Sequence, residues 1–102
     1  MEIFDLMKLD IKRNENRNAS VFFQNNLFKA LVIVLEAGEK IQKCQMESYV
    51  MFYVVKGEVL LQKNSEASIL KENQVFITEP ALLSMETTLG ARLMGIQIKV
   101  EK

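Results

Sequence analysis

The sequence predicts an all-β domain, a sandwich or jelly-roll barrel of antiparallel strands. Short runs rich in Val, Ile, Leu and aromatic residues recur at a spacing of about 8–12 residues, and Gly, Asn or Pro lies between them. No amphipathic helix of convincing length appears after residue 20. The chain has 102 residues, of which 49% are hydrophobic and 25% charged, and these values are typical of one globular domain.

The first twenty residues differ from the rest of the chain and are expected to form a short N-terminal arm. Apolar residues between positions 3 and 9 suit a short helix or strand that docks on the body. The segment that follows is polar and rich in Asn, which favours turns. We therefore expect an arm over residues 1–20 and a single β domain over residues 21–102.

Strands are expected wherever β-branched and aromatic residues gather between turn residues. Gly57 breaks the strongest run, so the segment after it reads as a return strand, and Pro80 stops another strand. Residues 39–47 are polar and are expected to be a connection. The expected strands cover residues 21–23, 27–36, 49–56, 58–63, 67–70, 74–78, 82–87 and 91–100.

The strongest expected strand, residues 49–56, is apolar on both of its faces, and residues 31–35 behave in the same way. A strand with one face in water should alternate apolar and polar residues, so both faces should be covered. A second copy of the chain is the expected cover, with the arm folding over the same face as the alternative. The expected homodimer interface consists of Met51, Tyr53, Val55, Leu31 and Ile33.

Composition excludes several classes of function. The chain has no histidine, which removes Ser-His-Asp and Cys-His nucleophile systems and most zinc and iron sites. Thirteen basic and thirteen acidic residues cancel, so charge gives no case for nucleic acid or an anionic membrane. No apolar run approaches the ~20 residues of a spanning helix. One cysteine and a charged N-terminus lead us to expect a cytoplasmic protein.

Two segments resemble the sequence motifs of the cupins, and the resemblance covers about residues 27–100. LEAGEKIQKCQMESYVMFYVVKGEV is similar to the first motif, with Gly38 and Gly57 at its two glycine positions. KENQVFITEPALLSMETTLGARLMGIQI is similar to the second motif, in which a third histidine follows a Pro/Gly turn. The resemblance implies an antiparallel barrel that holds a divalent metal by three His and one Glu. This chain has Cys44, Met46, Val50 and Leu83 at those positions, with Met85 as the alternative to Leu83.

These substitutions predict a barrel without a metal or other cofactor, because none of the four is an oxygen or imidazole ligand. Further residues expected to line the interior are Phe52, Met85 and Ile96. No paired carboxylates or phosphate-binding loop indicate catalysis, so no catalytic residue is assigned.

Several functions remain open at this point. The interior is either a filled apolar core or a pocket for a small apolar or amphipathic molecule. A soft sulfur set of Cys44, Met46 and Met85 for Cu(I) is a weaker alternative. The chain is therefore expected to be a binding or accessory module. The alternative is a divergent, metal-independent isomerase or lyase that uses Cys44 or a Glu or Tyr at the edge of the pocket.

Overall fold

A computed structural model describes residues 1–11 and 18–100 of the chain, and the remaining parts of the expected arm and of the last expected segment lie outside the described residues. The described part folds into eight β-strands. It contains no helix with the length and hydropathy that a membrane crossing needs. The strands are β1 (Ala19–Gln24), β2 (Phe28–Leu35), β3 (Lys40–Gln45), β4 (Tyr49–Lys63), β5 (Glu66–Lys71), β6 (Val75–Thr78), β7 (Leu82–Glu86) and β8 (Ala91–Ile98).

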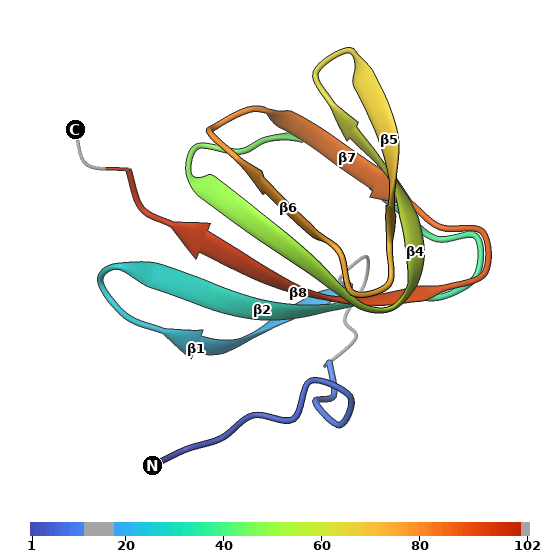
Figure 1. The fold of residues 1–102 in the computed structure, drawn as a ribbon. Helices are drawn as coiled ribbons and strands as arrows, with labels where there is room; N and C mark the ends of the chain where they lie inside the picture. Colours follow the sequence, from blue (N-terminus) through green and yellow to red (C-terminus); the bar gives the residue numbers. More distant parts are fainter. Residues whose placement is uncertain (12–17, 101–102) are drawn as a thin grey trace.

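All the strand pairs are antiparallel and form two sheets that share β4. Sheet A runs β1-β2-β8-β4, and β6 pairs with the other side of β4. Sheet B consists of β3, β7, β5 and the second half of β4. Figure 1 shows the two sheets curling toward each other into a half-barrel. The all-β class and the barrel architecture expected from the sequence are confirmed.

Strand β4 differs from the expectation, because Gly57 does not end it. Its first half pairs with β8 up to Gly57, and its second half continues without interruption into sheet B. Gly57 has a φ of 83°, and a Cβ at this position would lie 2.3 Å from the carbonyl oxygen of Gly90. Glycine therefore permits a sharp bend at a close backbone approach. Residues 58–63 are the far half of one bent strand and not a separate return strand.

Strand β3 occupies the segment that was expected to be a polar connection. Its residues are mostly exposed, and only Ile41 is half-buried and packs against the core. It pairs with β7 alone, so it is an edge strand of sheet B. Its formation depends on backbone pairing with β7, and its side chains carry no apolar periodicity that would reveal it.

The core lies between the two sheets and is apolar. Inward side chains of β2, β4 and β8 face those of the second half of β4, β5 and β7. Val54 and Leu93 are completely buried. The other members are Ile33, Leu35, Val50, Phe52, Val59, Leu61, Leu70, Ala81, Leu83, Met85 and Ala91.

The cross-strand register corrects part of the expected dimer surface. Leu31 and Ile33 lie inside the barrel, since a Cβ on Gly95 would lie 3.2 Å and 3.5 Å from their Cδ1 atoms and 3.4 Å from Phe52. Met51 and Tyr53 lie on the opposite, outer face of sheet A, opposite Ile96 and Met94. Val55 sits in a bulge of β4 and is half-buried. Leu31 and Ile33 therefore do not share a surface with the other three residues.

The arm covers part of the outer face of sheet A. The Arg92 guanidinium on β8 donates hydrogen bonds to the backbone carbonyls of Leu6 (2.9 Å) and Leu9 (2.7 Å). The ring of Phe4 also lies 4.8 Å from that of Phe22. Val32 on this face is only 1% exposed. The arm thus lies against its own sheet, outside the barrel (Figure 1).

Candidate functional site: the mouth of the barrel

One end of the barrel is bordered by a row of residues that crosses sheet A. The register places Gln24 opposite Lys29, Lys29 opposite Gln97, and Gln97 opposite Val50, which in turn faces Thr78. Directly opposed residues on adjacent strands point to the same face of a sheet. Because Val50 points into the core, this row also points inward. We call this end of the barrel the mouth.

A second row borders the mouth from sheet B. Cys44 on β3 lies opposite Leu83 on β7, and Leu83 lies opposite Lys63 on β4. One row deeper, the side chains are Leu31, Phe52 and Phe76 on sheet A and Leu61 and Met85 on sheet B. The interior therefore changes from polar at its edge to hydrocarbon immediately below.

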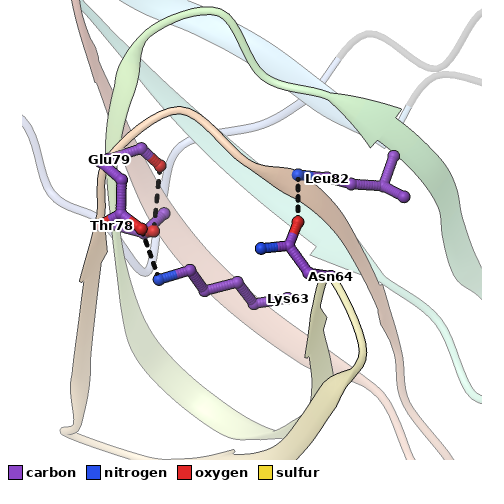
Figure 2. Close-up of polar contacts among 5 residues, drawn as sticks. All are labelled: Lys63, Asn64, Thr78, Glu79 and Leu82. Carbon is purple, nitrogen blue, oxygen red and sulfur yellow. Dashed lines mark hydrogen bonds and ion pairs between the residues drawn. The ribbon is translucent and has the colours of Figure 1, made fainter.

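An ion pair joins the end of β4 to the turn after β6, and two hydrogen bonds lie beside it (Figure 2). Lys63 Nζ lies 2.7 Å from Glu79 Oε1, and the Thr78 hydroxyl donates to the carbonyl of Glu79 at 3.0 Å. Asn64 Oδ1 accepts a hydrogen bond from the backbone N–H of Leu82 at 3.2 Å. The hydrogen bond from Lys63 lowers the pKa of the Glu79 carboxyl below its usual 4.5. These contacts hold the turn between β6 and β7 against the end of β4.

Two adjoining cavities open at the mouth. The larger has a volume of about 580 Å³, and the smaller about 110 Å³. Both are lined by Ser48, Gln97 and Lys99, so they lie next to each other. The larger extends along Cys44, Gln45, Met46, Glu47 and Val100, and the smaller along Gln24, Asn25, Phe28 and Lys29.

The structure divides the four positions that match the cupin metal ligands between the mouth and the core. Cys44 is exposed, and Met46 is half-buried and packs on the core; both line the larger cavity. Val50 is 1% and Leu83 5% exposed, and neither lines that cavity. Cys44 thus lies at the wall of the larger cavity, on the side that faces solvent.

The donor set does not fit a divalent metal. Val50 and Leu83 have only hydrocarbon side chains, and the remaining two positions supply one thiol and one thioether. Within residues 1–11 and 18–100, no three His, Cys, Asp or Glu side chains gather closely enough to hold a metal ion. The sulfur set considered for Cu(I) is spread over two rows, because Met85 is buried beside Leu61 in the deeper one.

The further residues expected in the pocket have different positions. Phe52 and Met85 point into the core, where they are 7% and 4% exposed. Ile96 lies on the outer face of sheet A, opposite Met51, so the expectation that it lines the interior is wrong. Its neighbour Gln97 is the inward residue. Both faces of β8 are apolar over most of its length, so the sequence pattern could not distinguish them.

Sequence reasoning missed the polar residues of the mouth. Lys29 and Gln97 lie inside strands, at positions that no sequence motif marks. Ser48 directly precedes β4, and Lys99 directly follows β8. Only the cross-strand register brings Lys29 and Gln97 together. Gln97 alternates with Gly95 and Leu93, so all three point to the same face of β8. This alternation identifies Gln97 as an inward residue only when the register of β8 is known.

Comparison with solved structures shows the same fold in other proteins. A Thermus thermophilus protein, TT1209, matches with a TM-score of 0.85 and 22% identity over 96% of this chain and 97% of its own. An RmlC-like cupin from Shewanella frigidimarina matches with a TM-score of 0.81 and 15% identity, covering 100% of this chain and 95% of its own. The cupin domain of Schizosaccharomyces pombe Cnp3 matches with a TM-score of 0.82 and 16% identity, over 95% of this chain and 73% of its own.

No protein-family model and no curated protein matches the sequence. The chain has the cupin fold, as the resemblance of its two motifs implied. At these identities the structural likeness shows the fold and leaves the function to the residues of the mouth.

Proposed function

We propose that this cupin-fold chain is a binding or accessory module that takes one small amphipathic molecule at the mouth, without a resident metal. The observation that carries the proposal is the open depression at the mouth, whose volume of about 580 Å³ gives room for part of a small molecule. Met46 and Val100 give it apolar walls, and Gln97 and Ser48 give it hydrogen-bonding groups. Val50 and Leu83 are buried beneath it and supply only hydrocarbon, which favours binding of a polar head group at the mouth over binding deep in the barrel.

The proposal is tested by titrating amphipathic probes into labelled protein and following the backbone amides by NMR. We expect shifts confined to amides of the mouth, such as those of Ser48 and Gln97, because these residues line both cavities. Met46→Trp should fill the larger cavity and abolish the shifts, while Leu89→Trp serves as the matched control at a position 89% exposed. Shifts spread evenly over the surface, or unchanged binding by Met46→Trp, would contradict the proposal.

The alternative function is a metal-independent isomerase or lyase, and the exposure of Cys44 in the mouth favours it. Glu47 lines the same cavity, so its carboxylate is placed to act as the acid or base of such an enzyme. The tyrosines offer no support, because both lie on the outer face of sheet A. Tyr49 lies opposite Ile98, and the Tyr53 hydroxyl donates to Asn73 Oδ1 at 2.6 Å. Turnover of a bound molecule that Cys44→Ser abolishes, with unchanged binding and unfolding midpoint, would favour the enzyme over the binding module.

We also propose that the chain forms a homodimer through the outer face of sheet A, beside the region that the arm covers. Met51 and Tyr53 lie opposite Ile77 and Val75 of β6, which are 67% and 50% exposed. Exposed apolar residues gathered on one sheet face are typical of an interaction surface. Light scattering should give twice the mass of one chain. Ile77→Glu should return it to one chain, while Leu89→Glu should not.

The single free cysteine supports a reducing, cytoplasmic setting for this module. An unpaired exposed thiol is more readily oxidised outside such a compartment.

A further inference from the structure

The smaller cavity of the mouth is lined by two lysines that come from fixed backbone. Lys29 is the second residue of β2, and Lys99 follows β8 directly. The backbone N–H of Lys99 donates to the carbonyl of Leu27 at 3.1 Å. Asn25 Oδ1 accepts the backbone N–H groups of Leu27 and Phe28 at 2.8 and 2.9 Å, which orders the turn before Lys29. Both ammonium groups are therefore attached to an ordered wall.

The charges at the mouth are distributed unevenly between the two cavities. Among residues 1–11 and 18–100, the lining of the smaller cavity contains Lys29 and Lys99 and no carboxylate. The lining of the larger cavity contains Lys99 and one carboxylate, Glu47. Lys63 and Glu79 at the opposite side of the mouth are 2.7 Å apart and neutralise each other. The smaller cavity is thus a local concentration of positive charge in a chain whose net charge is zero.

Neutral hydrogen-bonding groups accompany the two lysines. Gln97 lies directly opposite Lys29, and Gln24 lies on the other side of Lys29 in the same row. Ser48 also lines both cavities. Side-chain amides and a hydroxyl donate hydrogen bonds to an anionic oxygen, and such charge-assisted bonds are stronger than neutral ones. From this end the larger cavity leads along Met46 and Val100, which offer hydrocarbon contacts.

From this arrangement we infer that the ligand of the mouth is a monocarboxylate with an apolar body. Its carboxylate lies in the smaller cavity between Lys29 and Lys99, with Gln97 and Ser48 as hydrogen-bond donors. Its hydrocarbon part lies in the larger cavity against Met46. This inference rests on the proposed binding function and adds the chemical class of the ligand.

The experiment compares three probes of equal chain length that differ only in their head group: octanoate, octanol and octylamine. Dissociation constants are measured from the amide shifts of Ser48 and Gln97 at low salt. We expect octanoate to bind about tenfold or more tightly than octanol, and octylamine to bind most weakly. Added salt should weaken the binding of octanoate and leave that of octanol unchanged, because salt screens charge interactions.

Two double variants test the lysines. Lys29→Gln with Lys99→Gln should bring the affinity for octanoate down to that for octanol. Lys40→Gln with Lys71→Gln removes the same charge from exposed positions that line cavities away from the mouth, and it should leave the preference unchanged. The comparison of the three probes on the unmodified protein needs no variant to fold.

The outcomes distinguish this inference from the proposed function. If octanoate and octanol bind equally well at the mouth, or octylamine binds most tightly, the carboxylate inference is overturned and the binding function stands. If the three probes shift none of the mouth amides, the proposed function and this inference both fail. A preference for octanoate that persists in the Lys29→Gln, Lys99→Gln protein would also overturn the assignment of these two residues.

Discussion

Val50 and Leu83 decide what the interior of this barrel can do. Each lies in a row that borders the mouth, yet each is almost fully buried and supplies only hydrocarbon. Cys44 and Met46, the other two residues at metal-ligand positions, lie where solvent or a ligand reaches them. The residues that remain able to make polar contacts are therefore those of the mouth, and chemistry in the deeper interior is limited to packing.

The burial of Val50 predicts a large cost for a polar group at this position. Val50→Glu places a carboxyl group in the apolar core without a partner, and we expect it to lower the free energy of unfolding by about 1–3 kcal/mol or more. Gln45→Glu, at an exposed position in β3, should change it little. Urea unfolding measures both variants. An unchanged midpoint for Val50→Glu would mean that this side chain does not point inward.

The Lys63–Glu79 ion pair predicts a dependence of stability on pH. The pKa of Glu79 is lower in the folded chain than its ordinary 4.5, chiefly through the hydrogen bond from Lys63. The pair therefore stabilises the fold above pH 4.5 and loses its effect as pH falls through the lower folded pKa. Both side chains are partly exposed, so the effect is small.

The measurement compares the unfolding midpoints of the original chain and Glu79→Gln from pH 7 down to pH 3. The original chain should be slightly more stable at pH 7, and the difference should shrink as the pH falls below 4.5. A difference that grows as pH falls would contradict the assigned direction of the pKa shift.

At the residue level, the sequence predicts the floor of the site better than its polar edge. The inward positions of Val50, Phe52 and Leu83 follow from alternation and from the cupin-like spacing. Lys29 and Gln97 look like ordinary surface residues along the chain. They become a site only because the register sets them opposite each other at the end of the barrel.

At the level of elements, β4 pairs with four other strands, and the bend at Gly57 allows it to belong to both sheets. Gly57 has a φ of 83°, and an added Cβ would meet the backbone of Gly90. Gly38 has a similar φ of 81°, but an added Cβ would have nothing within 4 Å. These two glycines therefore separate the effect of backbone conformation from that of close contact.

We predict that Gly38→Ala lowers the free energy of unfolding by about 1–2 kcal/mol, the cost of a left-handed conformation for a residue with a Cβ. Gly57→Ala should cost clearly more, because the strand or the turn at Gly90 must also move. Chemical unfolding of the two variants gives the comparison. Equal costs would show that β4 does not approach Gly90 as closely as the structure has it.

The strands that the sequence reveals are those with apolar side chains on a buried face. Strand β3 is an exception, since five of its six residues are exposed. The bend in β4 is a second exception. A glycine within an apolar run is compatible both with the end of a strand and with a bend in a continuous strand. Edge pairing and bends depend on the backbone of neighbouring strands, which the local sequence does not encode.

At the scale of the whole molecule, the outer face of sheet A is shared between two covers. The arm lies over the part next to Arg92, and the exposed apolar residues of β6 mark the part where we propose that a second copy binds. Apolar residues on both faces of β4 predicted that a cover is needed. The sequence could not show which part of this face the arm covers and which part is left for a partner, because that depends on where the arm docks.

The attachment of the arm predicts a local effect of removing Arg92. Arg92→Met deletes both hydrogen bonds to the carbonyls of Leu6 and Leu9. Hydrogen exchange at the amides of Lys8 and Leu9 should accelerate by about tenfold or more, while core amides keep their protection. Lys8→Met, at a side chain that is 85% exposed, is the control and should leave exchange at Leu9 unchanged. Equal exchange in both variants would mean that Arg92 does not hold the arm.

Hydrocarbon side chains, those of Val50 and Leu83, occupy two of the four positions at which the cupin motifs place metal ligands. The most direct test is elemental analysis of purified protein after dialysis against a chelator, with the metals counted per chain. We predict manganese, iron, nickel and zinc far below one atom per chain, because Val50 and Leu83 provide no ligand atoms. One tightly retained atom of any of these metals per chain would contradict the account.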